Sequence, residues 1–464
     1  MSKKTSKKPK SKNIIEMQLV NPNAAGIDVG DTLHAVAVPE GRDTERVKTF
    51  GATTCCLLAI VAWLKQCSIE TVAMESTGVY WKPLFELLIQ NGFEVYLINA
   101  KQVRNVTGRK NDEDDAMWIQ KLHSCGLLKS SFLPDDEQET LRTLVRYRKT
   151  LVQDCSRFIL RMQKSMELMN IKLHTVISDI TGQTGIAIVE AIIAGERKAE
   201  NFLPFVGKGI KASHDTIVKS LQGNWREEHL FTLAESYQFY KFYKERIANC
   251  DKQIEIQLQH YEASRNEGVI ETSAAKKEAE KALVKKPAKT KKKKDKNHPR
   301  FDVRGYLERI HGVDVLAIYG LSETGGLDIL AETGTDLSKW PSEGHFKSWL
   351  NLACNNKISG GKLISSHLMK KKPNLASQAF RNAANAVQKS EHWIGDYFRR
   401  MKTKGGNKYA VIATAAKIAT IYYKMVRYKQ EFNPVDLELY QQKYKQAKIK
   451  YFERKLNELK VQVA

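Results

Sequence analysis

The run Ala24-Ala-Gly-Ile-Asp-Val-Gly30 decides the fold, because an apolar segment ends there in an acid and a glycine. After a tight turn at Gly30-Asp31 comes a second β-rich run, Leu33–Pro39, and Val47–Phe50 adds a third. Short β-rich runs separated by turn residues are typical of antiparallel strands. The opening of the chain therefore predicts antiparallel strands, with Asp28 at the end of the first one.

The next segments alternate between helical and strand-like patterns. Helices are expected at Cys55–Gln66, Tyr80–Asn91 and from near Asp112 to Gly126, and strands at Glu70–Met74 and Phe93–Ile98. Three antiparallel strands followed by βαβα units describe a mixed α/β sheet, and the ribonuclease-H-like arrangement is one of few folds with that order. We therefore expect residues 23–130 to form one α/β domain.

Two long segments then repeat apolar residues with a 3-4 spacing. The first runs from Glu137 to about Asn170, and Arg148 is the one charged residue among its repeated positions, which we call the seam. The second runs from Leu230 to Tyr261, and Lys244 and Asp251 interrupt its seam. This spacing is typical of long helices that pair. Residues 131–264 are expected to form a helical coiled-coil arm, which either closes as a hairpin within one chain or joins copies of the chain into an oligomer.

Positive charge is concentrated in two short segments. The chain has 464 residues and a formal net charge of +23, and residues 1–12 alone carry six Lys and no acid. Residues 276–300 carry twelve cations against three acids. We expect a flexible basic tail over 1–22 and a flexible Lys-rich linker over 265–303, because these segments have little to bury. Charge of this kind favours a polyanion partner, nucleic acid before a membrane.

The remainder of the chain predicts a mostly helical C-terminal half. Residues 304–433 have the patterns of a compact helical domain, and 434–464 those of a basic amphipathic helix. The seven Cys show no zinc-site spacing, no apolar run is long enough to span a bilayer, and no signal-peptide core follows the N-terminal Lys residues. A cytoplasmic protein with no membrane partner is expected.

Four acids share a pattern that suits metal binding. Asp28 and Glu75 each end an expected strand, and Asp112 and Asp115 lie on one face at the start of the expected helix. Asp114 lies off that face. Acids in a first helical turn are individually explained by the helix dipole. As a set, however, the four carboxylates are what a two-metal phosphoryl-transfer site needs, so two Mg²⁺ (or Mn²⁺) ions are the expected cofactors.

Three motifs carry these acids: Gly26-Ile-Asp-Val-Gly, Met74-Glu-Ser-Thr-Gly-Val-Tyr-Trp and Arg109-Lys-Asn-Asp-Glu-Asp-Asp-Ala. In order and spacing they resemble the RuvC-like motifs of the IS110 family of transposases, relatives of the Piv invertase, with Asn111 where the family usually has Thr. Two C-terminal stretches resemble the family's second motif block and its Ser-Gly-Gly segment. They are Gly312–Gly334 and Trp349-Leu-Asn-Leu-Ala followed by Ile358-Ser-Gly-Gly-Lys.

The resemblance implies a DNA recombinase that cuts and rejoins strands to move a prokaryotic insertion sequence. It implies a RuvC-like domain with the acidic set Asp28, Glu75, Asp112 and Asp115, action at the nucleoid, and a dimer or tetramer around paired DNA sites. An element-encoded structured RNA, the bridge RNA, is the implied guide. A further implication is that Ser359 is the nucleophile, whereas without the resemblance Ser-Gly-Gly is most simply a turn.

Several cations lie beside these motifs. Lys362 follows the Ser-Gly-Gly segment, where it could hold a phosphate, and four more cations precede Asp112. Those four are Lys101, Arg104, Arg109 and Lys110. We expect them to contact nucleic acid along the cleft, with simple solvation at the surface as the alternative.

Two other functions remain open at this point. A RuvC-like structure-selective nuclease would use the same acids with water and no Ser intermediate. An actin-like ATPase or a nucleic-acid-binding scaffold is suggested by Gly26-Ile-Asp-Val-Gly, although that ATPase fold needs a second Asp-Gly-rich phosphate loop, which the sequence does not show.

Overall fold

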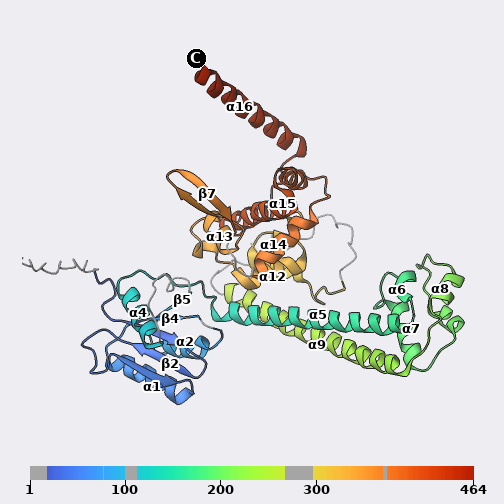
Figure 1. Cartoon of the computed structure of the whole chain (residues 1–464), viewed down its shortest axis with the longest axis horizontal. Coiled ribbons are helices and arrows are strands. Elements are labelled where there is room, and N and C mark those ends of the chain that lie inside the picture. Colours follow the sequence, from blue (N-terminus) through green and yellow to red (C-terminus); the bar gives the residue numbers. More distant parts are fainter. Residues whose placement is uncertain (1–17, 77, 100–111, 267–295, 369–373, 464) are drawn as a thin grey trace, which may run out of the picture. The chain divides into compact units, whose positions relative to one another are not determined.

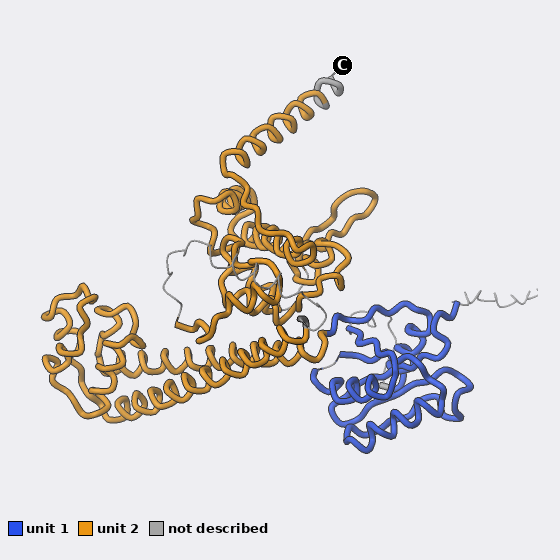
Figure 2. Tube along the Cα trace, turned by 180° about the vertical axis from the view of Figure 1, so that it is seen from behind, with its two compact units in different colours: residues 1–133 blue, residues 134–464 orange. Residues whose placement is uncertain are grey.

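The structure is a computed structural model that describes residues 18–76, 78–99, 112–266, 296–368 and 374–463. It divides into two compact units, residues 1–133 and 134–464 (Figure 2). The basic tail at 1–12 and nearly all of the Lys-rich segment at 276–300 lie outside the described residues.

The first unit is built on a five-stranded sheet with the order β3-β2-β1-β4-β5 (Figure 1). Its strands are β1 (Ala24–Val29), β2 (Leu33–Ala37), β3 (Val47–Gly51), β4 (Thr71–Glu75) and β5 (Glu94–Ile98). β1, β2 and β3 pair in antiparallel fashion, whereas β4 and β5 run parallel to β1. The mixed α/β sheet expected from the sequence is confirmed.

Helices cover both faces of this sheet. Ile27 and Met74 point to one face and are buried with residues of α1 (Thr54–Gln66) and α2 (Trp81–Gln90). The opposite face carries Ala35, Ala37 and Ala73, which pack against α4 (Asp112–Ser124). The small Ala side chains allow this helix to lie close to the strands, because a shorter side chain permits a shorter distance between helix axis and sheet.

The second unit begins with a long helical arm. α5 (Asp136–Leu168) and α9 (Glu227–Asn266) pack against each other lengthwise (Figure 1). Between them the chain forms four short elements that share one apolar core with Met162, Met166 and Leu233 of the arm. These elements are α6 (Leu173–Val176), α7 (Gln183–Ile193), η1 (Ala199–Phe205) and α8 (His214–Ser220).

Most of the repeated apolar positions of the arm are buried within a single chain. Leu151 and Cys155 of α5 and Ile247 and Ile254 of α9 are at most 6% exposed. Two charges that interrupt the pattern, Arg148 and Asp251, form a buried ion pair with each other. The hairpin alternative therefore accounts for the seam without a second copy of the chain.

The rest of the second unit is mostly helical, as the sequence predicts. An aromatic core that includes Phe346, Phe380, Tyr422 and Tyr423 holds its central helices together. In chain order its elements are α11 (Val303–His311), η2 (Val315–Ala317), α12 (Glu323–Thr333), η3 (Leu337–Lys339), α13 (Glu343–Trp349), β6 (Asn355–Ser359), β7 (Lys362–His367), α14 (Leu375–Ala386), α15 (Trp393–Tyr428) and α16 (Leu437–Val463).

One feature of this region was not anticipated from its sequence, the hairpin formed by β6 and β7. Its strands are exposed, so they lack the apolar alternation by which a half-buried strand is usually recognised. The turn between them, Gly360-Gly361, supplies the local preference that forms the hairpin.

Two observations concern membrane-spanning helices and cysteines in the described segments. None of the helices described here combines the length and the apolar character that crossing a membrane requires. All seven Cys lie in described segments, and they form no disulfide.

Candidate active site

Asp28 and Glu75 lie at the carboxyl ends of neighbouring strands. β1 and β4 are parallel and pair through Ile27 and Met74, and each acid is the next residue along its strand. Equivalent positions of adjacent parallel strands share one face of the sheet, about 4.8 Å apart along the hydrogen-bonding direction. Both residues are half-buried. The sheet thus places the two carboxylates at the carboxyl-terminal ends of two inner strands, on the face that α4 covers.

Gly26 determines how closely α4 approaches these strand ends. A Cβ atom at Gly26 would lie 2.2 Å from the backbone nitrogen of Gln120 and 2.4 Å from the carbonyl oxygen of Ala116. Only glycine permits this contact. Further back on β1, the carbonyl of Ala24 accepts a hydrogen bond from the Gln120 side chain at 3.3 Å.

The direction of α4 follows from these contacts. Gly26 of β1 contacts Gln120, whereas Val20, which precedes β1, donates a backbone hydrogen bond to the carbonyl of Ser124 at the end of α4. Later residues of the helix thus lie beside earlier residues of the chain, so α4 and β1 run in opposite directions. Moving from Gly26 to Asp28 covers about 6.6 Å of strand, which equals about four residues of helix. The first turn of α4 therefore lies at the level of Asp28.

The two acids of α4 belong to this first turn. Asp112 and Asp115 lie one helical turn before Ala116 and Ile119, which are fully buried against the sheet. Residues four positions apart share a helix face, so Asp115, four residues before the buried Ile119, lies on the sheet-facing side. Asp115 is half-buried, and the side chain of Asp112 lies outside the described part of the structure.

A metal site would draw on these acids. Their oxygen donors match the ligands that hard divalent cations prefer, and acids from two strand ends and one helix start suit such an ion. Among the side chains that the structure describes, no group of three or more His, Cys, Asp or Glu is close enough to hold a metal ion.

Ser359 lies at the tip of the β6–β7 hairpin, in the second unit. Ser359 pairs with Lys362 across Gly360 and Gly361, whose φ angles are +54° and +74°. Positive φ at both central residues is the signature of a type I′ turn, which suits glycine. Nothing lies within 4 Å of the position that a Cβ would take at either glycine, and Ser359 and Lys362 are exposed. The hairpin therefore presents the hydroxyl to solvent beside a cation.

The four cations expected near Asp112 fall outside the described residues. They are Lys101, Arg104, Arg109 and Lys110.

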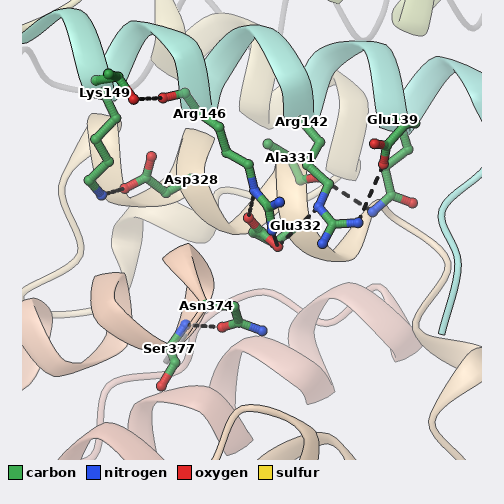
Figure 3. Close-up of polar contacts among 11 residues, drawn as sticks. Glu139, Arg142, Arg146, Lys149, Asp328, Ala331, Glu332, Asn374 and Ser377 are labelled. Atoms are coloured by element: carbon green, nitrogen blue, oxygen red, sulfur yellow. Dashed lines mark hydrogen bonds and ion pairs between the residues drawn. The ribbon is translucent and has the colours of Figure 1, made fainter. Parts of the chain in front are cut away.

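Sequence reasoning missed an ionic junction between α5 and α12 (Figure 3). Glu332 is buried on α12, and its carboxylate accepts two hydrogen bonds from Arg146, at 2.8 and 3.0 Å. Arg142 lies 3.3 Å from the same carboxylate, and Lys149 donates to Asp328 at 2.9 Å. Burial raises the pKa of Asp328, and the charge of Lys149 acts in the opposite direction.

The signal for this junction was present in the sequence as two spacings. Asp328 and Glu332 lie four residues apart, and Arg142, Arg146 and Lys149 lie at spacings of four and three. Each spacing puts the charges on one helix face. Helical spacing is local information, and the two segments are far apart along the chain. The sequence of either segment therefore does not identify the other as its partner.

Comparisons with known families cover both units. A family model of IS110-type DEDD transposases matches residues 25–171, which include the four acids and α5. A model described as transposase of the IS116/IS110/IS902 family matches residues 314–399, which include α12 and the Ser359 hairpin. No curated protein matches the chain.

The first match covers most of the first unit and the start of the second, the other lies within the second unit, and together they cover about half of the chain. Transposases act on DNA, and DEDD transposases depend in general on divalent metal ions. The actin-like ATPase alternative finds no support in either match. This chain belongs to the IS110 family of DNA transposases.

Proposed function

We propose that this transposase cuts and rejoins DNA with a composite site, in which Asp28, Glu75, Asp112 and Asp115 hold two Mg²⁺ or Mn²⁺ ions and Ser359 is the nucleophile. The observation that carries the proposal is the placement of Asp28 and Glu75 at neighbouring parallel strand ends, level with the first turn of α4. The strand order β3-β2-β1-β4-β5 supports a RuvC-like fold for this unit.

The acids would act by binding and orientation. Bound divalent ions would supply positive charge beside the scissile phosphate and make a coordinated hydroxyl more acidic. The sheet contributes Asp28 and Glu75 from rigid strand ends, and Gly26 allows α4 to bring Asp115 to the same level. A rigid frame matters because catalytic groups lose effect when their positions are loose.

Ser359 would attack a DNA phosphate. Its Oγ forms an ester bond to phosphorus while a phosphorus–oxygen bond of the DNA breaks, and the hydroxyl proton passes to a base as the leaving DNA oxygen takes up a proton. A serine hydroxyl needs such activation. Gly360 and Gly361 leave room for the DNA backbone, and Lys362 lies across the turn, where it can neutralise phosphate charge.

Three further parts of the proposal concern partners. Lys101, Arg104, Arg109 and Lys110 would contact phosphates next to the acids. A structured bridge RNA encoded by the element would choose donor and target. The chain would work as a dimer or tetramer, which light scattering on the nucleic-acid complex tests directly.

The acids are tested by titration with metal. Glu75→Gln and Asp28→Asn should lower strand cleavage by about a hundredfold or more, because charge stabilisation by a metal is worth several kcal/mol. Asp114→Asn is the matched control, since Asp114 adjoins Asp115 on the same helix and is not assigned to the site. EDTA should abolish cleavage and Mn²⁺ should restore it, while circular dichroism confirms folding. Full activity in EDTA would contradict the metal-bound acids.

Ser359 is tested by trapping the covalent intermediate. Wild-type protein should carry a labelled DNA strand through denaturing electrophoresis, and Ser359→Ala should lose that band while still binding DNA. Ser365→Ala on the neighbouring strand β7 is the matched control and should keep it.

The same experiment decides between recombinase and nuclease. Strand cleavage that persists in Ser359→Ala without a covalent band would mean that the acids act with water, as in a RuvC-like nuclease. Normal recombination by Ser359→Ala would mean that Ser359 is a turn residue and not the nucleophile.

A further inference from the structure

A cluster of stacked aromatic rings lies on the surface of the arm. Phe158 of α5 stacks on Phe239 of α9, with ring centroids 4.7 Å apart and planes 20° apart, and on Tyr243 at 5.5 Å and 27°. Phe242 meets the edge of Tyr243 at 5.7 Å. We call these four residues the arm aromatic cluster.

The arm aromatic cluster is not needed to close the arm. The seam is formed by other residues, including Cys155 and Ile247, which are buried between the helices. Phe239 and Phe242, in contrast, are 46% and 52% exposed. Large aromatic side chains gathered at a surface, rather than scattered singly, mark an interaction site, because exposing them to water is unfavourable.

Cations frame the rings. The guanidinium group of Arg161 lies 4.7 Å from the centre of the Phe158 ring, and that of Arg246 lies 5.3 Å from the centre of the Phe242 ring. The segments 154–164 and 239–246 together contain six Lys or Arg and two acids. The cluster is therefore an aromatic surface of net positive charge.

This combination distinguishes between possible occupants. A second copy of the arm would bring the same excess of cations against itself, and like charges disfavour that contact. Double-stranded DNA would meet the cations, but its stacked bases could not reach the flat rings. Unpaired nucleotides satisfy both features, because bases stack on aromatic rings while phosphates meet the cations.

We propose that the arm aromatic cluster binds unpaired nucleotides of the DNA on which this transposase acts. DNA is the polyanion that the family's activity supplies. The inference goes beyond the composite site and requires none of its residues, so it can be tested in EDTA, where no cleavage is expected.

The experiment measures binding of the full chain to fluorescent oligothymidine by anisotropy. Phe239→Ala with Phe242→Ala should weaken binding by about tenfold or more, because each stacked base contributes strongly to affinity. Phe231→Ala is the matched control, since Phe231 is 67% exposed on the same helix and lies outside the cluster. It should change the affinity less than about twofold, as for an ordinary surface substitution.

Further variants separate stacking from charge and from misfolding. Phe239→Tyr with Phe242→Tyr should retain binding to oligothymidine, because the rings remain. Phe239→Leu with Phe242→Leu keeps apolar area but removes the rings, so it should lose binding. The Phe variants should leave the dependence of affinity on salt unchanged, while Arg161→Ala with Arg246→Ala should flatten it. A 2-aminopurine base in the oligonucleotide should be quenched by wild-type protein and less so by the Ala pair.

Four results would overturn the proposal. The first is equal affinity of the Ala pair and wild-type protein for oligothymidine. The second is an equal loss for duplex DNA, which would make the cluster a duplex contact. The third is a loss confined to oligouridine, which would assign it to RNA. The fourth is a change of oligomeric state by light scattering without a change in DNA binding, which would assign it to a second copy of the chain.

Discussion

His123, in the last turn of α4, is a buried base in the first unit. It is 1% exposed, its Nε2 lies 2.9 Å from the hydroxyl of Thr71, and its ring packs on that of Tyr96. Burial lowers the pKa of His123 to about 4, although the charge of Glu94 acts in the opposite direction. Burial also lowers the pKa of His34 on β2. Folding therefore keeps both imidazoles neutral at pH values where the unfolded chain would protonate them.

This predicts acid sensitivity of the first unit. Between pH 6.5 and 4 the unfolded state binds more protons than the folded state, so stability falls as pH falls through that range. For His123 the loss should reach about 3 kcal/mol, at 1.36 kcal/mol per pKa unit. Hydrogen exchange of β4 and α4 peptides, corrected for intrinsic rates, measures it. In His123→Gln, the dependence of stability on pH should fall to the part that His34 contributes. His345 is an exposed residue of the second unit, so His345→Gln should leave the dependence of stability on pH unchanged.

At the scale of elements, the arm shows how two charges can be accommodated in an apolar seam. Arg148 and Asp251 pair with each other, and the same Arg148 donates to the carbonyl of Asn297 at 2.8 Å. Asp251 also accepts a hydrogen bond from the backbone of Arg300 at 3.3 Å. The pair thus holds the last residues of the Lys-rich segment, Asn297 to Arg300, against the two helices.

A double-mutant cycle tests this pair. Arg148→Met alone should destabilise the arm by about 3–5 kcal/mol, because it leaves a buried carboxylate without its partner. Arg148→Met with Asp251→Leu should recover most of that loss in denaturant unfolding. The exposed pair Arg157–Asp154 is the matched control, and its removal should cost less than about 1 kcal/mol. Single changes as mild as the control would show that the buried pair is not coupled.

For the molecule as a whole, positive charge is concentrated in two basic segments of the sequence. Residues 1–12 and 276–300 account for most of the net charge of +23. Replacing their Lys residues with Gln keeps the length of the chain and removes the cations. We expect weaker binding to DNA and a shallower dependence of affinity on salt, because fewer counterions are released.

The measurement is a salt titration of DNA affinity, with thermal unfolding as the control for the folded units. An unchanged slope of affinity against salt would mean that these segments do not contact phosphates.

The sequence by itself determined the local parts of this protein. The strands from Ala24 to Ile98 were readable because each short run is bounded by turn residues, and the family motifs located the transposase regions. The preference for Asp115 over Asp114 also came from helical spacing alone, and it stays a prediction. In each case the deciding interactions lie within a few residues of one another.

Only the tertiary structure decided which distant segments meet. Nothing in the sequence assigned a separate role to Gly26 within the first strand, yet it lets the backbone of α4 lie directly on β1. Arg148 and Asp251 looked like two separate defects in a seam, and they compensate each other only because α5 and α9 pack in that register. Glu332 likewise needs Arg146, which lies far away along the chain. Spacing within a segment predicts which side chains share a face. Which other segment packs against that face is determined by the packing of the whole unit.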